Sequence, residues 1–195
     1  MKKSKIWMLA AILSCGVVFL TSCNGNKTVA FDDELATAAT AQFMVDSIGS
    51  QYAAGEVCIP SVSIIAIEKT NSDSIKLWGD YWVFNYNIVG DTLKCVSGGS
   101  HPGVMYLRST GDGYEVISFD QVADGSEYLE SAKRIFGESL YDQFHAINSN
   151  PEVREDVRSS YIADYVKAHN LPVKFYQDYG WPAKEIPVVN NEAQN

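Results

Sequence analysis

Between Ile59 and Asp120 apolar residues alternate with polar ones, a period of two that indicates β-strands whose side chains point to opposite faces. The longest such segment runs from Ser74 to Val89. Its apolar face consists of Trp82, Phe84, Tyr86 and Ile88, and its half-polar face of Tyr81, Val83, Asn85 and Asn87. A sheet of this composition has at least one face to bury, so the rest of the chain must supply helices that cover it.

Turn residues divide this region into strands. The segments 70–73, 90–91 and 111–113 are rich in Asn, Asp and Gly, and a glycine-rich segment, 98–103, contains a proline. The expected strands are 61–69, 74–89, 92–97, 104–109 and 114–120. Short connections join them, so we predict an antiparallel meander of about five strands, interrupted at 98–103.

Helical spacing flanks the sheet on both sides. Asp32 and Asp33 are suited to begin a helix that continues to about Gly49. Asp124 and Glu127 have the spacing of a capping box. The helices expected after the sheet are 124–136, 138–147 and 150–170, the last of which begins at an Asn-Pro pair. The chain is therefore predicted to be α+β, with one domain over 32–187 and a loose C-terminal end over 188–195.

The first 26 residues have the composition of an export signal. Three lysines precede an apolar run from Ile6 to Leu20, which is too short to cross a hydrocarbon core of about 30 Å. The sequence Leu-Thr-Ser-Cys that closes the run resembles the lipobox of bacterial lipoproteins. This resemblance implies removal of residues 1–22, a lipid on Cys23, and a tether over 23–31. It also implies a lipid-anchored location in the cell envelope, at the outer membrane of a Gram-negative bacterium, facing the periplasm or the surface.

From Cys23 onward the chain carries 12 basic and 24 acidic residues, a net charge of −12. This charge argues against nucleic acid as a partner, because phosphate groups require a basic face. It also gives no electrostatic help in binding anionic lipid beyond the anchor.

The order of elements, a helix followed by a meandering sheet and further helices, is similar to that of the cystatin-like and NTF2-like folds, in which a curved sheet wraps a helix. Two segments within 81–137 resemble a family of uncharacterised bacterial lipoproteins and secreted proteins. Their sequences are YWVFNYNIVGDTLKCVSGGSHPG and DGYEVISFDQVADGSEYLESAKRIFG. These proteins share a glycine-rich loop and an Asp-Gly-Ser turn before a helix. The resemblance implies no activity for any named residue.

Ser100 and His101 are the one place where a nucleophile and a base are adjacent. Neighbouring side chains of an extended segment point apart, so we expect two separate residues at the rim of a turn, with ligand or partner contact as the alternative. Tyr81 and Tyr106 belong to a set of aromatic residues that either fill the core or line a concave pocket on the half-polar face.

Cys58 and Cys95 are the cysteines left once the segment through Cys23 is set aside. In an extracytoplasmic compartment these two cysteines can form a disulfide. The alternative is that Cys95 is a buried free thiol. The three histidines lie in separate elements, and the carboxylates of 120–130 do not match a calcium loop, so no metal is expected. No motif for a phosphate or a dinucleotide is present, so no cofactor is expected.

These patterns favour a non-catalytic envelope lipoprotein that binds a protein or small molecule at the membrane surface. One alternative is an inhibitor or immunity protein against an envelope hydrolase, which a long protruding loop or edge strand would support. The other is an envelope enzyme, which requires His101 and a carboxylate such as Asp120 to converge in a cleft.

Overall fold

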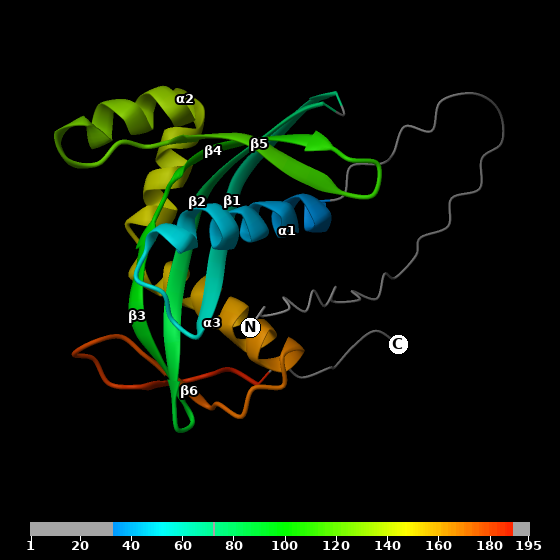
Figure 1. The fold of residues 1–195 in the computed structure, drawn as a ribbon. Coiled ribbons are helices and arrows are strands. Elements are labelled where there is room, and N and C mark those ends of the chain that lie inside the picture. Colours follow the sequence, from blue (N-terminus) through cyan, green and yellow to red (C-terminus); the bar gives the residue numbers. More distant parts are fainter. Residues whose placement is uncertain (1–32, 72, 189–195) are drawn as a thin grey trace. The chain divides into compact units, whose positions relative to one another are not determined.

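Strand β2 (Ser74–Val89) is the centre of the sheet, because it pairs along both of its edges (Figure 1). The computed structural model describes residues 33–71 and 73–188, which fall within one compact unit. On one edge, β2 pairs antiparallel with β1 (Val57–Asn71). On the other, it pairs with β3 (Thr92–Ser100) and then with β4 (Gly103–Ser109).

Strands β3 and β4 form one continuous line along β2. Trp82 lies opposite Ser100 and Gly79 opposite Gly103, so the register is the same on both sides of the break. The interruption predicted over 98–103 is therefore confined to His101 and Pro102, and the glycines continue the strand. The expected turn with exposed rim residues is wrong, because each glycine here allows a close approach that keeps the segment in the sheet.

Three more strands extend the sheet outward. Strand β5 (Tyr114–Gln121) pairs antiparallel with β4, as expected. Strand β6 (Phe175–Gln177) runs parallel to β3, and β7 (Lys184–Glu185) pairs antiparallel with β6. The sheet is thus mixed and mostly antiparallel, with seven strands among the described residues rather than about five. The two additional strands are three and two residues long, too short to show a period of two.

Helical segments precede and follow the sheet. Helix α1 (Asp33–Phe43) continues through a π-helical turn, η1 (Met44–Ile48), and a 3₁₀ turn, η2 (Gly49–Gln51). After β5 come a 3₁₀ turn, η3 (Gly125–Glu127), helix α2 (Tyr128–Asn148) and helix α3 (Pro151–Ala168). None of the helices in the described ranges is long and apolar enough to span a bilayer.

Of the predicted helix boundaries at Gly137, Asn150 and Asp124, the first two are confirmed. Gly137 breaks α2 with a φ of +64°, a conformation that favours glycine. The side chain of Asn150 caps α3 by accepting hydrogen bonds from the amides of Glu152 and Val153, at 3.0 and 3.3 Å. The capping box is wrong, because the Asp124 side chain makes no cap and the Ser131 hydroxyl accepts the Ala123 amide nearby instead.

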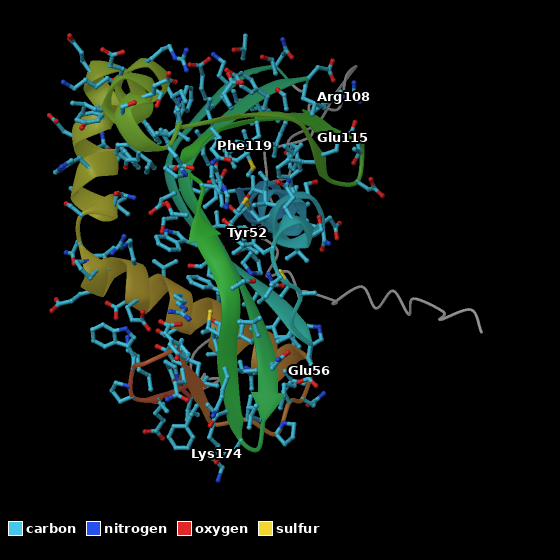
Figure 2. All side chains as sticks on the ribbon, turned by 60° about the vertical axis from the view of Figure 1, so that its left-hand side comes forward. Tyr52, Glu56, Arg108, Glu115, Phe119 and Lys174 are labelled. Carbon is cyan, nitrogen blue, oxygen red and sulfur yellow. The ribbon has the colours of Figure 1, made fainter. Side chains whose placement is uncertain are left out.

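The sheet lies between α1 on one side and α2 and α3 on the other (Figure 2). Odd-numbered side chains of β2, from Ile75 to Val83, pack against Ala36 and Met44, and we call this side the α1 face. Trp78 packs with α2 and Tyr86 with α3, which defines the α2–α3 face. The expected alternation is confirmed. The signal, the tether, Cys23 and residues 189–195 of the predicted C-terminal end lie outside the described residues.

A substitution at Gly98 tests the close packing of β3. A Cβ atom there would lie 2.4 Å from the Val83 carbonyl oxygen, whereas a Cβ at Gly113 meets nothing closer than 3.8 Å. We expect Gly98→Ala to lower the free energy of unfolding by about 2 kcal/mol or more, and Gly113→Ala to change it by less than about 0.5 kcal/mol. Urea denaturation of both variants measures this, and equal effects would contradict the register described here.

Candidate functional site

Ser100 and His101 point to opposite faces of the sheet and do not form a pair. The Ser100 hydroxyl donates to Asp80 Oδ1 at 2.8 Å, whereas the His101 ring contacts Tyr52 and Gln121. Their predicted separation is confirmed, but both are half-buried members of polar networks rather than residues of a rim.

Asp80 is a buried carboxylate on the α2–α3 face, 1% exposed. Besides Ser100, the indole of Trp82 and the amide of Asn148 donate to it, at 3.0 and 3.5 Å. Three donors from β2, β3 and the end of α2 thus satisfy its oxygens. A buried carboxylate held in this way fixes the orientation of the Trp82 ring.

His101 lies on the other face. Its Nδ1 is 3.1 Å from the Gln121 side-chain oxygen, which only accepts, so Nδ1–H donates. In the neutral ring Nε2 then accepts from the Tyr52 hydroxyl at 2.9 Å. Asp120, the carboxylate required by the enzyme hypothesis, instead accepts from Tyr106 at 3.3 Å. The structure does not bring His101 and Asp120 into contact.

The two tyrosines proposed as contact residues have different environments. Tyr81 is fully buried in the core, and its hydroxyl donates to the Leu77 carbonyl at 2.6 Å. Burial raises its pKa. Tyr106 instead lines an open pocket of about 440 Å³ between β4 and α2, together with Asp120 and Arg134.

Cys58 and Cys95 are free thiols, not a disulfide. They lie on β1 and β3, the two strands that flank β2, so about 10 Å separates their Cα atoms, beyond the reach of a disulfide. They also belong to core clusters on opposite faces of the sheet. Burial raises the pKa of both thiols, that of Cys58 to about 11, so at Cys95 the buried-thiol alternative is the one that the structure supports.

The second pocket lies on the α2–α3 face, between β2 and α3, and has a volume of about 310 Å³. We call it the β2–α3 pocket. It is lined by Ser61, Trp82, Phe84, Pro151, Arg154, Glu155, Arg158 and Asp178. Both of these pockets are thus on the face with the aromatic row. On the half-polar face α1 packs against the sheet, so for Tyr81 the structure supports the core alternative.

Arg158 is the most deeply buried charge of the pocket, 6% exposed. Its guanidinium makes two hydrogen bonds to Asp178, at 2.7 and 2.8 Å, and two to the Tyr86 hydroxyl, at 2.8 and 3.0 Å. It also lies 4.0 Å above the Phe84 ring centre. Burial opposes its charge, but these hydrogen bonds leave its pKa raised, so Arg158 remains a cation.

Arg154, one helical turn earlier, is not paired in this way. Its guanidinium lies 5.4 Å from the Trp82 ring centre and is half-buried. Among the described residues no carboxylate lies within ion-pair distance of it. Glu155, the neighbouring acid, is already engaged by Lys184 at 3.0 Å and by the Tyr176 hydroxyl at 2.5 Å. Of the two lining arginines, Arg154 is therefore the one that forms no ion pair with a described carboxylate.

Sequence reasoning missed this pocket, although a signal was present. Positions 151, 154, 155 and 158 follow the spacing i, i+3, i+4, i+7 of one helix face, but the residues are polar except for the proline. The apolar residues of the same helix do not mark this face: Val153 is 39% exposed, and Ile162 is buried elsewhere, against Tyr86. No group of three or more His, Cys, Asp or Glu in the described part of the chain has a metal-binding arrangement.

Removing the hydroxyl and the imidazole together tests the two networks. We expect the double variant Ser100→Ala, His101→Ala to lose about 1–3 kcal/mol of unfolding free energy, because buried Asp80 and half-buried Tyr52 each lose a partner. Ser118→Ala, at an exposed serine of β5, is the control and should change stability by less than about 0.5 kcal/mol. A double variant as stable as the control in urea would show that the networks contribute nothing.

A pH series tests the ion pair of Arg158. The hydrogen bonds from Arg158 lower the pKa of Asp178 in the folded state, so the stability they contribute is present at neutral pH. It is lost as the pH falls through the unfolded value of about 3.9 towards the lower folded value. Since Asp178 is 41% exposed, we expect Asp178→Asn to cost only about 2 kcal/mol at pH 7, less than for a fully buried pair, and less at pH 3.

The control for this series is Glu68→Gln, which removes an exposed ion pair with Lys76. It should cost less than about 1 kcal/mol at pH 7. Urea midpoints at both pH values give the comparison, and a cost of Asp178→Asn that does not fall with pH would exclude the ionised pair as its cause.

Comparison with known proteins gives no assignment: no protein-family model, no curated protein and no solved structure matches the chain. Its function is therefore inferred from the geometry of the β2–α3 pocket and from the sequence.

Proposed function

We propose that this chain is a non-catalytic envelope lipoprotein that binds a small organic anion in the β2–α3 pocket. The lipid on Cys23 holds the domain at the outer membrane. The ligand carries one carboxylate or phosphate group and a flat apolar part.

The observation that carries the proposal is the unpaired charge of Arg154. Asp178 neutralises Arg158, and Glu155 is engaged by Lys184 and Tyr176, so both lining carboxylates already have partners. A half-buried guanidinium beside them is suited to bind a carboxylate or phosphate through two parallel hydrogen bonds. An anion in this position would give the Arg154 guanidinium an ion-pair partner, which no described carboxylate supplies.

The aromatic walls support a flat apolar part of the ligand. Trp82 and Phe84 stack with a centroid distance of 5.6 Å and an angle of 9°. Pro151 lines the pocket from the first turn of α3. A volume of about 310 Å³ is at the small end of small-molecule sites. The net charge of −12 opposes the approach of a polyanion, so a ligand with a single anionic group fits better.

The membrane anchor is the second part of the proposal, and residues 1–23 support it. Their lysines, apolar run and Leu-Thr-Ser-Cys sequence are the features of a lipoprotein signal. A cystatin-like or NTF2-like arrangement belongs to the proposal as well. It is supported by α1, which precedes the meander and packs on one of its faces.

Two probes test the pocket: benzoate and phenyl phosphate, with benzyl alcohol as the uncharged analogue. We expect both anions to shift the indole N–H resonance of Trp82 in a saturable way and benzyl alcohol to bind at least about tenfold more weakly. Arg154→Gln should weaken both anions by about tenfold or more, because a charge-assisted hydrogen bond is lost.

The matched control is Arg134→Gln, an exposed arginine of the other pocket, which should leave the affinities unchanged. A preference for benzoate or for phenyl phosphate would distinguish a carboxylate from a phosphate ligand. Equal binding of benzyl alcohol, or an Arg154→Gln variant with wild-type affinity, would contradict the proposal.

A further inference from the structure

The connection between β6 and β7 carries the most exposed aromatic residues among those the structure describes. Tyr179 is 97% and Trp181 is 71% exposed, on either side of Gly180. This connection extends outward beside β3 and ends in the short pairing with β7 (Figure 1). We call residues Tyr179, Gly180 and Trp181 the aromatic turn.

The turn is held in this exposed position by contacts on both sides. Asp178, directly before it, is bound to buried Arg158. The Trp181 amide donates to the Asp178 carbonyl at 3.1 Å, and the Gln177 side chain donates to the Trp181 carbonyl at 2.7 Å. Gly180 has a φ of +79°, which completes the turn. The exposure of two large aromatic side chains is therefore a property of an ordered turn rather than of a loose end.

We propose that the aromatic turn inserts into the headgroup region of the membrane that anchors the chain, and so sets the orientation of the domain on that membrane. This inference rests on the proposed lipid anchor at Cys23. The ten residues 23–32 span at most about 35 Å. Such an anchor keeps the domain near the bilayer, but leaves its orientation to a second contact.

The chemistry of the turn favours lipid over a protein partner. Trp and Tyr are the side chains that gather at membrane–water interfaces, where the ring is apolar and its polar group remains hydrated. The run 179–183 contains no charge, although the chain is strongly acidic overall. Two aromatic side chains bury about 300–500 Å² together, below the roughly 600 Å² that each partner contributes to even a small specific protein interface.

The neighbouring charges are compatible with this contact. Lys94 on β3, opposite Gln177 in the sheet, and Lys174 before β6 are both exposed, and long side chains of this type extend to the headgroups. Glu185 on β7 is an exposed acid close by. Because the two signs are mixed, insertion should depend on the aromatic rings and occur on uncharged phosphatidylcholine.

The test uses the full lipidated chain, reconstituted into phosphatidylcholine vesicles with or without brominated acyl chains, which quench tryptophan on contact. We expect brominated lipid to reduce the emission of the wild type and to leave Trp181→Phe unaffected. The matched control adds Leu129→Trp to Trp181→Phe, because Leu129 is an exposed apolar residue of α2, 50% exposed. That double variant should show no quenching.

Vesicle flotation separates this inference from the proposed function. We expect the lipidated wild type to float and a chain that begins at Asn24, without the signal and the lipid, to remain in solution. A wild type that floats without quenching by brominated lipid overturns insertion of the turn, leaves the anchor intact, and points to a protein partner. Equal quenching at position 129 also overturns it, since contact would then not be specific to the turn. A wild type that does not float overturns the anchor and, with it, the insertion.

Discussion

The buried guanidinium of Arg158 joins three parts of the molecule that are distant in sequence. It belongs to α3, it binds the Tyr86 hydroxyl on β2, and it binds Asp178 after β6. A cation at this depth is stable only when its hydrogen bonds replace the lost hydration, and four of them do so here. The β2–α3 pocket and the aromatic turn both depend on this single side chain. Asp178, which it binds, lines the pocket and directly precedes the turn.

The two faces of the sheet differ in the polarity of the residues that they bury. Where α1 packs against it, the α1 face is filled by an apolar cluster that includes the fully buried Tyr81. The α2–α3 face carries the charges, among them Asp80 within the row of aromatic residues and Arg154 above Trp82. Helices α2 and α3 cover this face incompletely, and the pockets lie in the spaces that they leave. The proposed binding site thus lies where the neighbouring carboxylates already have partners and Arg154 does not.

Much of the secondary structure followed from local pattern. Three features depend only on residues close by in the sequence and were therefore predictable: the alternation in β2, the helix break at Gly137 and the Asn150 cap. Strands β6 and β7 were not, because they are short and owe their conformation to pairing, β6 with β3 and β7 with β6, rather than to their own sequence. The turn expected at 98–103 was wrong for a related reason: a glycine in the sequence does not show whether it bends the chain or admits a neighbouring strand, as Gly98 admits β2.

The sequence by itself determined that this chain is α+β and that β2 has two faces of different polarity, and its N-terminus resembles a lipoprotein signal. Only the tertiary structure decided which helix covers which face. It buried the charged Arg158, because Asp178, 20 residues further along the chain, neutralises the guanidinium. On the same helix, α3, it left the apolar Val153 exposed. Ion pairs between distant segments leave no periodic pattern in a sequence, so the pocket that depends on this one became visible only in the folded chain.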